Sequence, residues 1–125
     1  MPITWTISHT ERLVSARGKG PVKIADFEAY FDNIVVSGAA TYRKYFDSSD
    51  IEPQLSDTDL MSLGARVSAY AELGRAGAMA IVVSSQAGYE LAARYTNLAR
   101  GERAARIFWE ADKARQWLEA QPAVN

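Results

Sequence analysis

Apolar and polar residues follow two different periods along this chain, and the change of period predicts alternating strands and helices. Strict alternation over residues 3–8 is typical of a half-buried strand, and the short turn that follows predicts residues 13–17 to be its β-hairpin partner. A continuous apolar run at residues 78–83 is typical of a strand buried on both faces of a sheet. Two further strands are predicted at residues 42–46 and 106–108.

Between these strands, apolar residues recur every three or four positions, which is the spacing of an amphipathic helix. The helices predicted in this way cover residues 24–37, 56–74, 87–99 and 111–120. Ser56 and Asp59 have the spacing of a capping box and predict where the second helix begins. The polar segment at residues 47–55 contains Pro53 and is predicted to be a loop.

The order of these elements, ββαβαβαβα, predicts an α/β fold with a mostly parallel, mixed sheet of about five strands and about four helices. The N-terminal hairpin requires one antiparallel strand, which we expect at an edge of the sheet. A length of 125 residues and a hydrophobic content of 48% suit a single domain over residues 1–125. Residues 121–125 are expected to fray.

The composition narrows the classes of function. The formal net charge is −1, whereas nucleic-acid-binding proteins usually carry a basic excess, so no nucleic-acid partner is predicted. The absence of cysteine excludes disulfides and thiolate chemistry and suits a reducing cytoplasm. No apolar run has the length that a membrane span needs, and residues 1–5 do not resemble a signal peptide. A soluble, cytoplasmic protein is therefore predicted.

Acidic residues are concentrated in one segment, residues 47–59, which contains five acids and no basic residue. Asp47, Asp50, Asp57 and Asp59 are the candidates for a surface that contacts a protein partner. Their spacing does not match a calcium-binding loop, so no metal and no cofactor is predicted. The simpler interpretation is a solvated loop whose acids favour the positive end of the helix dipole.

Arginines are concentrated in a later segment, where Arg94, Arg100, Arg103 and Arg106 have only Glu102 against them. Such a group is a candidate contact for an anionic ligand or an acidic partner, and the alternative is an ordinary charged surface. The separation of acids from arginines also makes an interface between copies conceivable. Because sheet edges and surface aromatics favour self-association, a homodimer is predicted.

The sequence contains no complete catalytic motif. His9 is the single histidine, and a solvent-exposed position in the hairpin turn is predicted for it. Gly18 and Gly20 flank a lysine, but the ending of a phosphate-binding loop and the spacing of a dinucleotide fingerprint are absent, so they predict a turn. We therefore predict no catalytic residue and no enzymatic activity.

With Asp47-Ser48-Ser49 after its third strand, the chain resembles the STAS domain of anti-sigma-factor antagonists and, more closely, the SpoIIAA-like family of small bacterial proteins, also described as STAS/SEC14-like. The resemblance spans nearly the whole chain. The segments that carry it are residues 3–8, 22–27, 46–48 and 114–118.

This resemblance implies a regulatory or protein-interaction module whose serine is phosphorylated by a partner kinase, so that the added charge blocks binding. By local motif the phosphoacceptor is Ser48 or Ser49, and by position at the helix start it is Ser56. A phosphate beside Asp47 and Asp57 would meet like charges. The resemblance to SEC14-type domains implies the alternative function, a carrier or sensor for a small apolar or anionic molecule or a lipid. The protein partner is not identified by either interpretation.

Overall fold

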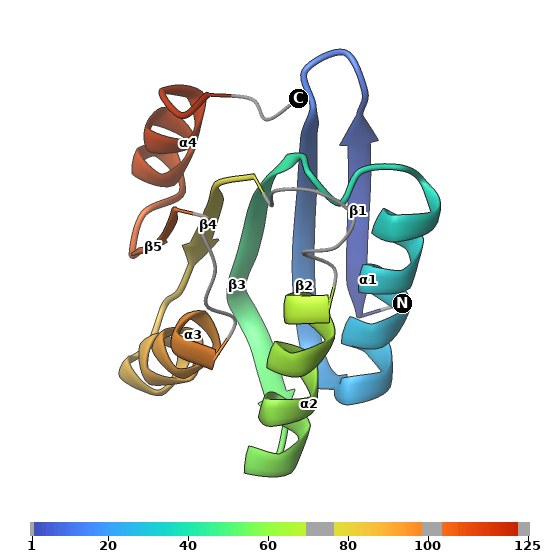
Figure 1. The fold of residues 1–125 in the computed structure, drawn as a ribbon. Helices are drawn as coiled ribbons and strands as arrows, with labels where there is room; N and C mark the ends of the chain where they lie inside the picture. The colour runs from blue at the N-terminus through green and yellow to red at the C-terminus, as the bar shows by residue number, and fades with distance from the viewer. Residues whose placement is uncertain (1, 70–76, 99–103, 123–125) are drawn as a thin grey trace.

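The computed structural model describes residues 2–69, 77–98 and 104–122 (Figure 1). The elements are β1 (Ile3–Ser8), β2 (Leu13–Lys23), α1 (Ile24–Val36), β3 (Arg43–Gln54), α2 (Asp57–Ala69), β4 (Met79–Val82), α3 (Gln86–Leu98), β5 (Ala105–Phe108) and α4 (Ala111–Glu119). Their order is the predicted one. Among the described helices, none has the length and apolar character required to cross a membrane.

The strands form one sheet in the order β1-β2-β3-β4-β5. β1 pairs antiparallel with β2, and every later neighbouring pair is parallel. β1 and β5 lie at opposite edges of the sheet (Figure 1). The predicted α/β class, the mixed and mostly parallel sheet, and the edge position of the antiparallel strand are therefore confirmed.

Both faces of the sheet are covered around β4, which explains its uninterrupted apolar sequence. Met79 and Ile81 belong to a core cluster with residues of α1, α2 and α3. Ala80 and Val82 belong to a second cluster, with Ala114 and other residues of α4. Successive residues of a strand point to opposite faces, so a strand between two helical layers must be apolar at every position.

The segment predicted as a loop, residues 47–55, is mostly strand, and that prediction was wrong. β3 continues to Gln54 because β2 continues to Lys23, and the backbones of the two strands pair along this added length. Backbone pairing does not require apolar side chains, so the polar sequence gave no sign of it. β4 accompanies β3 only as far as Asp47, so Pro53, which lacks an N–H, lies where β3 has a free side.

The turn predicted at Gly18 and Gly20 is also wrong, since both glycines lie within β2. A β-bulge occurs here: Gly18 alone lies opposite the two residues Ser48 and Ser49 of β3. A Cβ atom on Gly18 would collide with Cγ2 of Ile51, so the close approach of β3 requires glycine.

The second helix begins as predicted. The backbone N–H of Asp59 donates to Ser56 Oγ at 3.0 Å, and the N–H of Ser56 donates to Asp59 Oδ2 at 3.0 Å. The predicted end of this helix near residue 74 lies outside the described residues. At the C-terminus, Gln121 donates its N–H to the carbonyl oxygen of Leu118 at 3.1 Å, and residues 123–125 are outside the described part of the chain.

Candidate functional site

A pocket of about 150 Å³ lies between the sheet and the layer of helices α1, α2 and α3. Its apolar lining includes Phe27 and Phe31 of α1, Phe46 and Ile51 of β3, Leu60 and Leu63 of α2, Met79 and Ile81 of β4, and Leu91 and Tyr95 of α3. Five elements that are distant in the sequence therefore contribute to one site. The helices are amphipathic, and their apolar faces enclose it.

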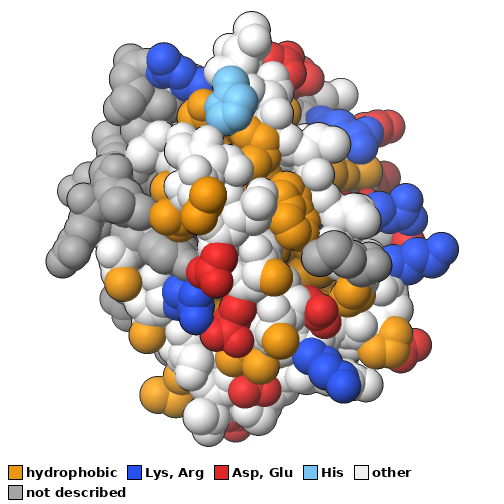
Figure 2. All heavy atoms as spheres, turned by 90° about the vertical axis from the view of Figure 1, so that its right-hand side faces the viewer, with side chains coloured by type: hydrophobic (Ala, Val, Ile, Leu, Met, Phe, Trp, Pro, Cys, Tyr) orange, Lys and Arg blue, Asp and Glu red, His pale blue; other side chains and the backbone are white. Residues whose placement is uncertain are grey.

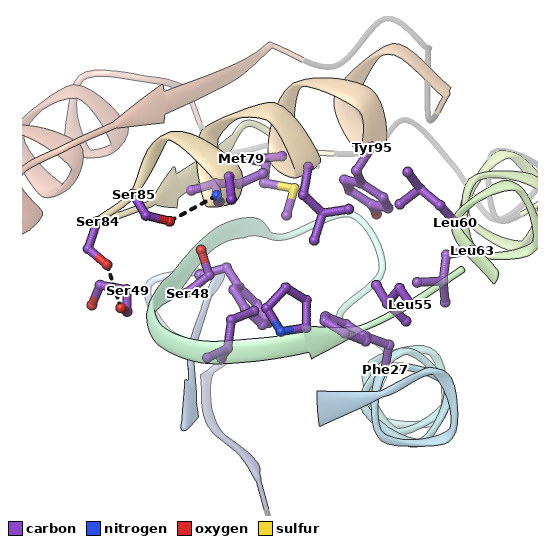
Figure 3. Close-up of a pocket in the computed structure, with 18 of the residues that line it drawn as sticks. Phe27, Ser48, Ser49, Leu55, Leu60, Leu63, Met79, Ser84, Ser85 and Tyr95 are labelled. Atoms are coloured by element: carbon purple, nitrogen blue, oxygen red, sulfur yellow. Dashed lines mark hydrogen bonds between the residues drawn. The ribbon is translucent and has the colours of Figure 1, made fainter. Parts of the chain in front are cut away.

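One end of the pocket is apolar and the other is formed by serines (Figure 3). Phe27, Leu63 and Tyr95 surround the apolar end, on the opposite side of the pocket from the serines. Ser84 and Ser85 are exposed, so the pocket reaches the protein surface at the serine end. A molecule could therefore enter with its apolar part directed inward.

The serine end is held by hydrogen bonds among its own groups. Ser48 Oγ donates to the carbonyl oxygen of Val82 at 2.6 Å, which joins β3 to β4. Ser84 Oγ donates to the carbonyl oxygen of Ser49 at 2.6 Å (Figure 3). Ser85 Oγ accepts the backbone N–H of Gly88 at 3.0 Å and so caps the start of α3.

The β-bulge explains why two consecutive residues of β3 line the same pocket. Up to the bulge, Phe46 and Ser48 face the pocket, and beyond it Ser49, Ile51 and Pro53 do so. Without a bulge, neighbouring residues would point to opposite faces. The bulge therefore places both serines at the site and keeps Ile51 and Pro53 on the same face as Phe46 despite the extra residue.

The four acidic candidates all have partners within the chain. Asp47 Oδ1 accepts from Ser49 Oγ at 2.5 Å and from its backbone N–H at 3.0 Å. Asp50 pairs with Arg17, and this hydrogen bond and charge raise the pKa of the arginine. Asp57 pairs with Arg94. With Asp59 in the capping box, the acids are divided between strand and helix positions, and none of the four lines the pocket.

The arginine candidates are not brought together as one described group. Arg94 connects α3 to α2 through Asp57, and the guanidinium of Arg106 lies 5.3 Å from the centre of the Phe108 ring. Arg100 and Arg103 lie outside the described residues. Neither Arg94 nor Arg106 lines the pocket. Their proposed contact with an anionic ligand stays a prediction.

The serine candidates fall into two environments. Ser48 and Ser49 are half-buried in the pocket wall, where both hydroxyl groups donate hydrogen bonds within the protein. Ser56 is exposed at the start of α2, outside the pocket lining. A kinase would therefore find Ser56 more accessible than the other two.

His9 is exposed, and its Nδ1 lies 2.7 Å from the hydroxyl of Tyr42. Figure 2 shows this single histidine at the surface, on a face where acidic and basic side chains are interspersed. Within the described residues, no group of three or more His, Cys, Asp or Glu side chains is arranged to hold a metal ion.

Sequence reasoning identified the right edge of the sheet but missed most of the pocket. The segment after the buried strand at residues 78–83 follows the carboxyl end of a parallel strand, and ligands of open α/β sheets bind beyond that edge. Ser84 and Ser85, which follow that strand, were not selected. The apolar residues that line the site gave no distinct signal, because core residues and pocket residues have the same helical spacing.

Among solved structures, the fold is similar to that of an uncharacterised protein of the DUF3478 family from Shewanella loihica PV-4, described as having a SpoIIAA-like fold. The two chains share 18% sequence identity, the TM-score is 0.62, and the match covers 93% of each chain. This likeness confirms the predicted SpoIIAA-like fold and concerns the fold alone. No protein-family model and no curated protein matches the sequence.

Proposed function

We propose that this SpoIIAA-like chain is a non-enzymatic binding domain that takes a small, largely apolar molecule into the pocket between β3, β4 and helices α1, α2 and α3. The pocket is the single observation that carries the proposal. Ligand sites are typically concave and mostly apolar, with a few polar groups that fix the orientation of the ligand. The hydroxyl groups of Ser48 and Ser85 supply that polar minority here.

The volume of the pocket indicates the size of the ligand. An apolar cavity of about 150 Å³ in another protein accommodates a molecule such as benzene. The present pocket has about the same volume, which suits a single ring or a short branched chain. A lipid with long acyl chains would exceed it, so among the carrier functions we favour a small molecule over a lipid.

The lining favours binding over catalysis. The described residues that line the pocket include no charged side chain and no histidine. General acid–base catalysis is carried most often by histidine or by a carboxylate, and the two tyrosines of the described lining, Tyr30 and Tyr95, have no such group beside them in it. Serine hydroxyls without an adjacent base are weak nucleophiles, so their role at the mouth is best explained as orientation of a bound molecule.

Binding of toluene provides a direct test, measured by thermal shift and calorimetry. Ala92 lines the pocket from α3 and is 8% exposed, so the larger side chain of Ala92→Leu should occupy space that the ligand needs. We expect toluene to raise the melting temperature of the wild type and to lose binding to Ala92→Leu. The exposed Ala65→Leu on α2 is the matched control and should bind as the wild type does. Equal binding by both variants would contradict the assigned pocket.

A second candidate function is a protein-interaction module switched by serine phosphorylation. Its support is the exposed position of Ser56 at the start of α2, together with the SpoIIAA-like fold. Helix N-termini favour negative charge, although Asp57 and Asp59 oppose it. In this function, the exposed residues around the start of α2 would form the surface for the partner.

Intact-mass measurement of the protein from its own cells tests this second candidate. A phosphorylated fraction that disappears in Ser56→Ala, but persists in Ser62→Ala, would support the switch. Ser62 is a suitable control because it is also exposed on α2. A chain without phosphate under all growth conditions would contradict the switch and leave the pocket proposal unaffected.

A further inference from the structure

We infer that the ligand of the pocket is an uncharged molecule with one hydroxyl group, of the class of small phenols and ring alcohols. This inference rests on the proposed function and goes further by assigning the polar group of the ligand. It follows from the hydrogen bonds that the serine hydroxyl groups form within the protein, and from the donor and acceptor positions that remain for a ligand.

Three serine protons at this end are already donated within the protein. Ser48 donates to Val82, Ser49 to Asp47, and Ser84 to the carbonyl oxygen of Ser49. Each hydroxyl oxygen still has lone pairs, because a hydroxyl combines one donor with two acceptor positions. Toward a ligand, Ser48 and Ser84 are therefore acceptors.

Ser85 has the opposite role. Its oxygen accepts the N–H of Gly88 at 3.0 Å, which caps α3, and no described residue accepts the proton of its own hydroxyl. This proton is free to rotate toward the pocket, which Ser85 also lines. The serine end therefore offers one donor, at Ser85, beside acceptors, at Ser48 and Ser84.

A hydroxyl group on the ligand matches this arrangement. It can donate its proton to Ser48 or Ser84 and accept the proton of Ser85, so both roles are used. A ketone or ether oxygen can only accept, and it would use Ser85 alone. A carboxylate would find one donor and face the acceptor oxygens of the other serines, with no positive charge among the described lining residues.

The apolar end favours an aromatic or compact ring for the rest of the ligand. Phe27 and Phe46 have ring centres 6.0 Å apart, and Tyr95 lines the same pocket from α3. Aromatic side chains make favourable offset or edge contacts with a further ring. The combination of a ring-sized volume and one donor–acceptor end is the basis for assigning a phenol-like ligand.

Three probes of similar size distinguish the polar groups: toluene, phenol and benzoate. Calorimetric titration of the full chain should give phenol about fivefold tighter binding than toluene, as expected for one net hydrogen bond. Benzoate should bind at least about tenfold more weakly than phenol, because its carboxylate would find a single donor and face the acceptor oxygens of Ser48 and Ser84. Equal affinity for toluene and phenol, or tightest binding of benzoate, would overturn the inference and leave the binding function intact.

Two variants identify the atoms. In Ser85→Ala, which removes the donor, and in the double variant Ser48→Ala/Ser84→Ala, which removes both acceptors, the preference for phenol over toluene should fall toward one, whereas Ser62→Ala should retain it. The toluene affinity in each variant shows whether the pocket is still formed, so a fault in folding is not mistaken for a lost hydrogen bond. A preference that persists in both variants would overturn the assignment of the polar end. Failure of all three probes to bind the wild type would overturn the inference and the proposed function together.

Discussion

At the residue scale, Tyr45 is an uncompensated polar group on the face of the sheet that α4 covers. It is 6% exposed, and its hydroxyl has no hydrogen-bond partner among the described residues. Burial raises the pKa of this hydroxyl, and the positive charge of Arg115, whose guanidinium lies 5.0 Å from the ring centre, acts in the opposite direction. The loss of hydrogen bonds to water on burial costs free energy of folding.

Tyr45→Phe should therefore leave the free energy of unfolding unchanged at neutral pH or raise it by up to about 1 kcal/mol. The folded-state pKa of Tyr45 lies above the ordinary value of 10.0, so its contribution to stability is fully present below that pH and is lost as pH rises through the folded pKa. Urea denaturation at increasing pH should show a smaller loss of stability in Tyr45→Phe than in the wild type. Equal losses would contradict a buried hydroxyl.

Gly18 is a second residue whose contribution to stability can be measured. Its substitution by alanine should lower the free energy of unfolding by about 1–3 kcal/mol, because the new Cβ would collide with Ile51 Cγ2 at the bulge. The same substitution in an Ile51→Ala background should cost less, since the colliding atom is removed. A double-mutant cycle by urea denaturation measures this difference. Additive costs would show that the two positions do not meet.

At the scale of elements, ion pairs connect α2 to the helices on either side. Arg66 donates to Glu28 at 2.7 Å and to Asp32 at 2.6 Å, both on α1, and its side chain is 33% exposed. Arg94 of α3 contacts Asp57 of α2, and both of these side chains are more exposed. The Arg66 group should stabilise the helix packing more, because solvent weakens exposed pairs.

Arg66→Ala is accordingly expected to lower the free energy of unfolding by about 1 kcal/mol, and Arg94→Ala by less than about 0.5 kcal/mol. Chemical denaturation of both variants at low salt, and again at high salt, measures the contributions. The Arg66→Ala effect should decrease at high salt but remain the larger one. The reverse order would show that the ion pairs on α1 do not support α2.

An element could be predicted from the sequence where its own apolar and polar residues follow a recognisable pattern. The helices have a clear period and β4 is a continuous apolar run, and the order of the elements indicated the class of sheet. The second half of β3 was not predictable, because Asp50, Glu52 and Gln54 are exposed and follow a bulge. Its strand conformation depends on backbone pairing with the distant β2, which no local pattern reports.

The candidate site was less predictable than the fold because it depends on distances between segments. The pairing of Asp57 with Arg94 joins two residues that the sequence had suggested as surfaces for different partners. The pocket likewise forms only when three helices meet the sheet, and its serines come from the middle of β3 and from the segment after β4. Sequence could indicate the edge of the sheet, but not which side chains converge there.

At the scale of the whole molecule, homodimer formation stays a prediction from the sequence. β1 and β5 are edge strands of the sheet, and Trp109, directly after β5, is 52% exposed and stacks with Tyr89. Unpaired strand edges and exposed aromatic rings favour association. Light scattering at micromolar concentration should give twice the mass of one chain. A monomer mass throughout a dilution series would contradict the prediction. Cytoplasmic location likewise remains a prediction.

The bulge opposite Gly18 makes the pocket depend on the number of residues in β3 as well as on their identity. Ile51, Pro53 and Leu55 share the pocket face with Phe46 because the bulge accommodates the extra residue that precedes them. If the two strands instead paired one to one through Ser48 and Ser49, every residue downstream would change faces, and the acidic residues at 50 and 52 would lie on the inner face. Deletion of Ser48 or Ser49 removes the extra residue and the bulge together, so the downstream residues keep their faces. The strand can therefore lose one residue at the bulge and still keep Ile51 and Pro53 on the pocket face, whereas one residue inserted between them should turn Pro53 away from the ligand.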